Sequence, residues 1–124
     1  MKRERSILLD KSEAFASRVI KMYQYLTNVK KESVISTQVL RSGTSIGANV
    51  SESRNAQSTA DFISKLSIAL KEADETSFWI KSLYEGGYIK EKEFQSIHGD
   101  CVEIIKILVS SIKTLKGRAN IPQE

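Results

Sequence analysis

The stretch Arg41-Ser42-Gly43-Thr44-Ser45-Ile46-Gly47-Ala48-Asn49-Val50-Ser51-Glu52-Ser53 places two glycines four residues apart inside an apolar pattern with the period of an α-helix. Each glycine costs a helix interior roughly 1 kcal/mol relative to alanine. Because a residue without a side chain lets another backbone come close, we expect Gly43 and Gly47 to lie where two helices pack tightly. One continuous helix is favoured, with a loop that splits it near Gly43 as the alternative. The apolar positions on this face are Ile35, Val39, Ile46 and Val50.

Three further segments show helical period, and none shows the sustained alternation of a β-strand. The third helix has the clearest start, because Ser58 is a good N-cap and Asp61 completes a variant of the capping box. Gly86-Gly87 suits its end, where the left-handed conformation is cheap. Four amphipathic helices joined by short links predict an all-α, antiparallel up-down four-helix bundle. We expect a single domain over residues 1–124, with residues 1–9 and the tail after Gly117 less ordered and helices over about 12–28, 33–55, 59–85 and 90–116.

The third of these helices is apolar on more than one side. Ile68, Trp79 and Leu83 fall away from its main apolar stripe, which begins at Phe62. A four-helix monomer offers each helix one core to face, so a second apolar side indicates burial against another chain. The pattern therefore predicts a homo-oligomer with Ile68, Trp79 and Leu83 in its interface.

The composition is that of a globular domain, and it indicates the compartment in which the protein works. The chain has 124 residues, of which 40% are hydrophobic and 27% charged, as in an ordinary globular domain. The single Cys101 excludes an internal disulfide and suits a reducing compartment. No apolar run approaches the roughly 18 residues of a membrane helix, and the N-terminus lacks the apolar core of a signal peptide. We expect a cytoplasmic protein that does not enter the membrane.

Basic charge is concentrated near the N-terminus. Residues 1–31 contain eight Lys or Arg against three Asp or Glu, in a chain of net charge +4. Such a surface attracts phosphates by counterion release, although a solvated basic face with no partner is the commoner outcome. Neither a helix-turn-helix nor aromatic residues among the basic ones are evident, so binding would be sequence-independent. The candidate nucleic-acid-binding residues are Lys2, Arg3, Arg5, Lys11, Arg18, Lys21, Lys30 and Lys31.

Catalytic and metal-binding constellations have little support. A di-iron bundle needs Glu-x-x-His pairs, and the one histidine, His98, has no Glu three residues before it. His98 and Cys101 are helical neighbours, but Cys101 falls on an apolar seam, where a thiol stays protonated. The glycine pair lacks the spacing and the lysine of a P-loop. We expect no enzymatic activity, no cofactor and no metal.

A polar set lies opposite the apolar stripe of the glycine-containing helix. Arg41, Asn49 and Glu52 belong to it. A polar helix face is usually solvated. The alternative interpretation is a network across a subunit interface, in which Arg41 and Glu52 find partners on another chain.

Several short motifs along the chain carry a family resemblance. Arg41, Ser45-Ile46, Ala48-Asn49, Glu52, Asp61-Phe62 and Glu85-Gly86-Gly87-Tyr88-Ile89 occur in this order and at this spacing. They resemble small bacterial four-helix bundle proteins encoded in ribosomal RNA intervening sequences, a family related to the accessory variability determinant of diversity-generating retroelements. The resemblance implies a pentameric bundle, with nucleic-acid association in some members and no established enzymatic activity.

Two functions remain open from the sequence. The first is a non-enzymatic, homo-oligomeric protein that associates with RNA or DNA through its basic surface. The second is an oligomeric scaffold or adaptor for a protein partner, without nucleic-acid binding. Their responses to salt differ, because phosphate neutralisation weakens steeply with salt whereas apolar contact does not.

Overall fold

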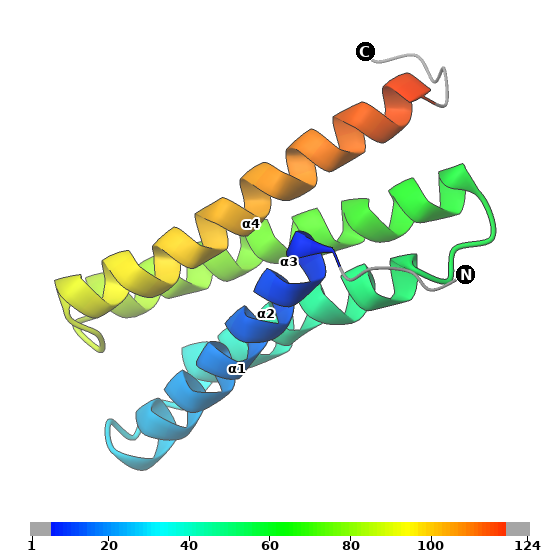
Figure 1. Cartoon of the computed structure of the whole chain (residues 1–124). Helices are drawn as coiled ribbons and strands as arrows, with labels where there is room; N and C mark the ends of the chain where they lie inside the picture. Colours follow the sequence, from blue (N-terminus) through cyan, green and yellow to red (C-terminus); the bar gives the residue numbers. More distant parts are fainter. Residues whose placement is uncertain (1–5, 119–124) are drawn as a thin grey trace.

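The computed structural model describes residues 6–118, and these residues form four helices and no strand (Figure 1). The prediction of an all-α four-helix bundle is confirmed. Residues 1–5 and 119–124, to which part of the order prediction applied, lie outside the described residues. The helices are α1 (Ile7–Asn28), α2 (Val34–Ser53), α3 (Thr59–Glu85) and α4 (Glu91–Arg118).

Helix α1 begins earlier than the sequence pattern suggested. The Ser6 hydroxyl accepts a hydrogen bond from the Leu9 backbone N–H at 3.0 Å and so caps the helix. Leu8 and Leu9 are buried in the core. The expectation that residues 7–9 would be less ordered was therefore wrong, because Ser6 caps the helix and Leu8 and Leu9 enter the core.

A buried carboxylate supplies the start of α2. Glu32 accepts hydrogen bonds from the backbone N–H groups of Val34, Ile35 and Ser36 at 3.1, 2.8 and 2.8 Å. These donors have no partner within the helix, and the negative charge also suits the positive end of the helix dipole. A single side chain thus fixes where α2 begins.

Both ends of α3 follow the local rules expected of them. The Ser58 hydroxyl accepts from the Asp61 N–H at 3.0 Å. At the other end, the N–H groups of Gly87 and Tyr88 donate to the carbonyls of Tyr84 and Leu83 at 3.0 and 2.9 Å, the two bonds of a Schellman motif. Gly87 has a φ of +83°, which only glycine adopts cheaply.

The glycine pair lies inside one uninterrupted helix, as predicted, and faces α1. A Cβ on Gly43 would meet a Val19 methyl at 3.0 Å, and one on Gly47 would meet the Ser12 backbone oxygen at 3.5 Å. Both glycines are buried. The absence of side chains therefore lets α1 approach α2 closely.

The helices form two antiparallel pairs, α1 with α2 and α3 with α4, joined through the long contact between α2 and α3 (Figure 1). The contact between α1 and α4 is the least extensive. One apolar core runs between the helices, with Phe15, Ile46, Ile80 and Leu108 among its fully buried side chains. Hydrophobic burial of this kind is the main source of stability in a bundle of this size.

The proposed second apolar side of α3 needs correction. Leu83 is fully buried in the core of the single chain, so its apolar character requires no partner. Trp79 is half-buried and packs against the same core. Ile68 and Phe78 remain 41% and 60% exposed. The exposed apolar surface of α3 is thus smaller than the sequence pattern indicated.

Candidate functional site

The predicted basic residues fall into three groups: those outside the described residues, those paired with carboxylates of α4, and those without an ion pair within residues 6–118. Lys2, Arg3 and Arg5 lie outside the described residues. Lys11 pairs with Glu103 at 3.1 Å, and Arg18 pairs with Asp100 at 2.6 Å and donates to the Ser96 hydroxyl at 3.1 Å. The partners all belong to α4, so these two cations join α1 to α4. Their charges are already compensated, which weakens their assignment as phosphate ligands.

Three of the predicted lysines have a positive charge that no carboxylate among the described residues neutralises. Lys21, Lys30 and Lys31 are exposed, and none of them forms an ion pair within the part of the chain that the structure describes. Lys30 and Lys31 belong to the link between α1 and α2, and Lys21 lies two turns earlier on α1. The basic surface is therefore centred on one end of the bundle.

A groove runs beside Lys21, between α1 and the start of α4. We call it the Tyr25 groove. It measures about 410 Å³ and has a Tyr25 ring that is 46% exposed. Apolar side chains and charged groups both reach it. Its lining residues are Arg18, Lys21, Met22, Tyr25, Ile89, Glu93 and Ile97.

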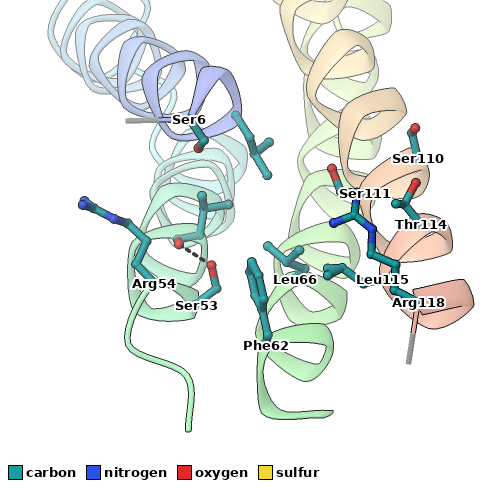
Figure 2. Close-up of a pocket in the computed structure, with 12 residues that line it drawn as sticks. Ser6, Ser53, Arg54, Phe62, Leu66, Ser110, Ser111, Thr114, Leu115 and Arg118 are labelled. Atoms are coloured by element: carbon teal, nitrogen blue, oxygen red, sulfur yellow. Dashed lines mark hydrogen bonds between the residues drawn. The ribbon is translucent and has the colours of Figure 1, made fainter. Parts of the chain in front are cut away.

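A second groove lies where α1 begins and α4 ends, and we call it the Phe62 groove (Figure 2). It also measures about 410 Å³. Phe62 and Leu66 of α3 and Leu115 of α4 give it apolar walls, while Arg54 and Arg118 stand at its sides. No carboxylate lines it among the described residues. The groove therefore suits an apolar group.

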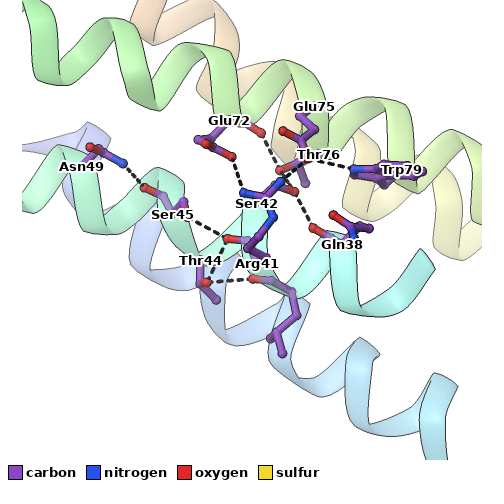
Figure 3. Close-up of polar contacts among 11 residues, drawn as sticks. Gln38, Arg41, Ser42, Thr44, Ser45, Asn49, Glu72, Glu75, Thr76 and Trp79 are labelled. Carbon is purple, nitrogen blue, oxygen red and sulfur yellow. Dashed lines mark hydrogen bonds and ion pairs between the residues drawn. The ribbon is translucent and has the colours of Figure 1, made fainter. Parts of the chain in front are cut away.

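The polar face of α2 contacts α3 of the same chain (Figure 3). Arg41 pairs with Glu72 at 3.3 Å and with Glu75, and the Trp79 indole donates to Glu75 at 3.1 Å. The hydrogen bond from Trp79, together with that from Arg41, lowers the pKa of Glu75. The hydrogen bond with Glu75 in turn raises the pKa of Arg41. The Arg41 side chain is about half exposed to water, so the pairs add little stability and mainly orient one another.

The other two polar residues predicted at an oligomer interface also have partners within the chain. Glu52 pairs with Lys65 at 3.1 Å, and the Asn49 side chain donates to the Ser45 carbonyl at 2.9 Å. Arg41 and Glu52 therefore need no second subunit to satisfy their charges. This face of α2 thus connects to α3 within the chain, and its contact with a second subunit stays a prediction.

His98 and Cys101 do not form a reactive pair. The Cys101 thiol is buried and donates to the Ala73 carbonyl at 3.3 Å, and burial raises its pKa to about 12. His98 instead lies 2.8 Å from the Ser77 hydroxyl and stacks on Phe94. Burial, with a contribution from the charge of Lys81, lowers the pKa of His98. The Cys101 side chain therefore serves as part of the core, and the His98 imidazole links α4 to α3.

The described residues offer no metal site, membrane-spanning helix or phosphate-binding loop. Within residues 6–118, no group of three or more His, Cys, Asp or Glu side chains is placed to hold a metal ion. No helix there has the length and apolar character to cross a membrane. The Gly43–Gly47 segment is helical, which rules out a phosphate-binding loop at that position.

Tyr25 is the residue that the sequence interpretation missed. Arg18, Lys21 and Tyr25 are spaced three and four residues apart, so that two basic side chains and one aromatic side chain share one face of α1. The spacing was visible in the sequence. What it could not reveal was that Ile89 and Ile97 come from the other end of the chain to form a floor beside this face.

The fold and these surfaces define a small all-α protein of the antiparallel four-helix bundle class. The chain belongs to the 23S rRNA-intervening sequence protein family, whose family model matches residues 4–110. The resemblance to the intervening-sequence family is thereby confirmed, whereas the relation to the accessory variability determinant stays a prediction.

A solved structure supports the same assignment. It is a protein of unknown function from the S23 ribosomal protein family of Bacteroides thetaiotaomicron, 52% identical to this chain with a TM-score of 0.85. The match covers 86% of this chain and 99% of that one. Among curated proteins the comparison finds no significant match.

Proposed function

We propose that this protein is a non-enzymatic, homo-oligomeric bundle that associates with RNA or DNA through the basic end formed by Lys21, Lys30 and Lys31. The observation that supports this most is that these three lysines are exposed and have no ion pair within the described residues. The sequence pI of about 9.2 agrees with an attraction to polyanions.

The mode of binding follows from the charges. Lysines that neutralise phosphates release condensed counterions, and this contribution is independent of base sequence. An oligomer repeats the basic end in each subunit, so several weak contacts act together on one nucleic acid. Binding is therefore electrostatic, multivalent and weakly selective for sequence.

The test is a fluorescence anisotropy titration of a short labelled DNA duplex at several salt concentrations. The log affinity should fall linearly with log salt, by about 0.9 for each phosphate neutralised. Absence of binding at low salt, where electrostatic attraction is strongest, would contradict the proposal.

The oligomer is the second part of the proposal, and a pentamer is its specific form. It rests on the exposed Ile68 and the half-buried Trp79, on the neighbouring ring of Phe78, and on the motif resemblance. The relation to the accessory variability determinant and a cytoplasmic location are proposed on the motifs and on the single cysteine. Sedimentation velocity at micromolar concentration tests the assembly, and a monomer there would contradict it.

The alternative function is an oligomeric scaffold or adaptor for a protein partner. The Phe62 groove and the 60% exposed Phe78 favour it, because both offer apolar surface that residues 6–118 leave uncovered. A partner held by such surfaces would stay bound as salt increases. Salt-resistant binding of protein and no binding of nucleic acid would establish the alternative instead.

A further inference from the structure

The Tyr25 groove combines three features, of which the proposed electrostatic function uses only the positive charge of Lys21. An aromatic ring is exposed at its edge, an apolar floor lies beneath, and charges of opposite sign stand on its two rims. We infer that this groove holds an unpaired base of a single-stranded nucleic acid, with the neighbouring phosphate on Lys21. The inference rests on the proposed function and adds the strand form that is bound.

The ring and the floor provide a surface for a base. Tyr25 is 46% exposed, and its side chain makes no hydrogen bond within the described residues. Ile89 and Ile97 are buried at 8% and 4% exposure, so the bottom of the groove is apolar and firmly packed. Bases stack on exposed aromatic rings, and the space of about 410 Å³ is within the range of sites for small ligands.

The charges place the phosphate on one side. Lys21 on the α1 rim is exposed and has no ion pair among the described residues, whereas the neighbouring Arg18 is held by Asp100 and Ser96. On the other rim, the Glu93 carboxylate accepts from the Lys90 N–H at 3.0 Å. A carboxylate repels phosphate but accepts hydrogen bonds from the amine of a base. The backbone therefore follows α1, and the amine edge of the base faces Glu93.

This arrangement favours single strands over duplexes. In a duplex the bases are stacked on one another and their pairing edges are occupied, so none can enter a groove of this kind without being unstacked. The lysines contact the phosphates of either form. Single strands should consequently bind more tightly, with the difference arising at Tyr25.

The experiment compares fluorescently labelled oligocytidylate with a DNA duplex of equal length, by anisotropy at low salt. Tyr25→Leu should weaken oligocytidylate binding roughly 5- to 150-fold and leave duplex binding unchanged. Tyr25→Phe should retain the single-strand affinity, because the ring remains. Lys21→Gln should weaken both. The control Tyr23→Leu removes a half-buried ring of α1 that does not line the groove, and it should change neither.

The unmodified protein offers a second measurement. Oligocytidylate should bind more tightly than oligouridylate, because only cytosine presents an amine to Glu93. Equal affinities of Tyr25→Leu and the unmodified protein for oligocytidylate would overturn the inference while leaving the proposed function intact. A preference for oligouridylate would also overturn it. Failure of the unmodified protein to bind any strand would overturn both.

Discussion

Gly43 and Gly47 face different neighbours on α1, although they occupy equivalent places in the sequence pattern. A Cβ on Gly43 would lie 3.0 and 3.1 Å from the two methyl groups of Val19, which is too close for ordinary contact. A Cβ on Gly47 would lie 3.5 Å from the nearest atom of Ser12, an ordinary van der Waals distance. The two positions should therefore respond differently to alanine.

The first prediction compares Gly43→Ala with Gly47→Ala. Both gain about 1 kcal/mol of helix propensity, but at Gly43 overpacking against Val19 costs about 1–3 kcal/mol. Gly47→Ala should be neutral or stabilising, and Gly43→Ala should be the less stable of the two by at least about 1 kcal/mol. Urea unfolding measures both. Equal stability of the variants would show that Val19 moves aside freely.

The second prediction concerns His98, the only histidine in the chain. Burial lowers its pKa in the folded state, so between that value and the ordinary value of 6.5 the unfolded chain binds more protons. Stability should therefore be full above about pH 7 and fall as pH decreases through this window, before carboxylates titrate below about pH 5.

His98→Phe is the control for this prediction, because a phenyl ring can stack on Phe94 but cannot titrate. Its urea midpoint should change little between about pH 5 and 7, whereas that of the unmodified protein should fall. Identical pH profiles for the two proteins would contradict the assignment.

The contact between α2 and α3 contains a buried pair of hydroxyl groups. The Thr76 hydroxyl donates to the Ser42 hydroxyl at 2.8 Å, and the Ser42 hydroxyl donates to the Gln38 carbonyl at 2.9 Å (Figure 3). Both side chains are fully or almost fully excluded from solvent. The Thr76 hydroxyl also lies 2.7 Å from the Glu72 carbonyl, so each hydroxyl has an acceptor on its own helix, and the bond between the two adds a polar contact across the buried interface of α2 and α3.

The third prediction is a double-mutant cycle on this pair. Thr76→Val alone should cost roughly 1–2 kcal/mol, because it removes the bond while keeping the shape. In the Ser42→Ala background the same change should cost about 1 kcal/mol less. Urea unfolding of the four proteins gives the coupling energy. Strict additivity would mean that the two hydroxyl groups contribute independently.

Helix boundaries were predictable where a local motif defines them. The Ser58 cap and the Gly86-Gly87 end gave the limits of α3 as Thr59–Glu85, as found. The start of α1 was missed, although Ser6 stands three residues before Leu9 in a capping position. This cap was overlooked because the clearest apolar stripe of the helix begins only at Phe15, well after the apolar residues 7–9.

Partners between helices were less predictable than the helices themselves. Leu83 was assigned to an outer face because α3 packs against both α2 and α4, so its buried face is wider than one apolar stripe. Arg18 was assigned to a phosphate surface because its partner, Asp100, lies 82 residues away. Local spacing identifies a charged position on a helix face but not the distant carboxylate that meets it.

The net charge of the whole protein is only +4, so the position of the basic residues matters more for nucleic-acid binding than their number. Net charge alone would attract nucleic acid through any exposed lysine. The proposed contact lies instead at Lys21, Lys30 and Lys31. Two sets of substitutions with the same change in charge separate these explanations.

The most direct test therefore compares the salt dependence of duplex DNA binding for two triple variants. One carries Lys21→Gln, Lys30→Gln and Lys31→Asn, where asparagine suits the φ of +58° at that position. The control carries Lys71→Gln, Lys106→Gln and Lys113→Gln, three exposed lysines elsewhere on α3 and α4. The first should lose up to about 0.9 from the slope of log affinity against log salt for each lysine that meets a phosphate, and the control should keep the slope of the unmodified protein. Equal slopes for both variants would contradict a binding surface at this end of the bundle.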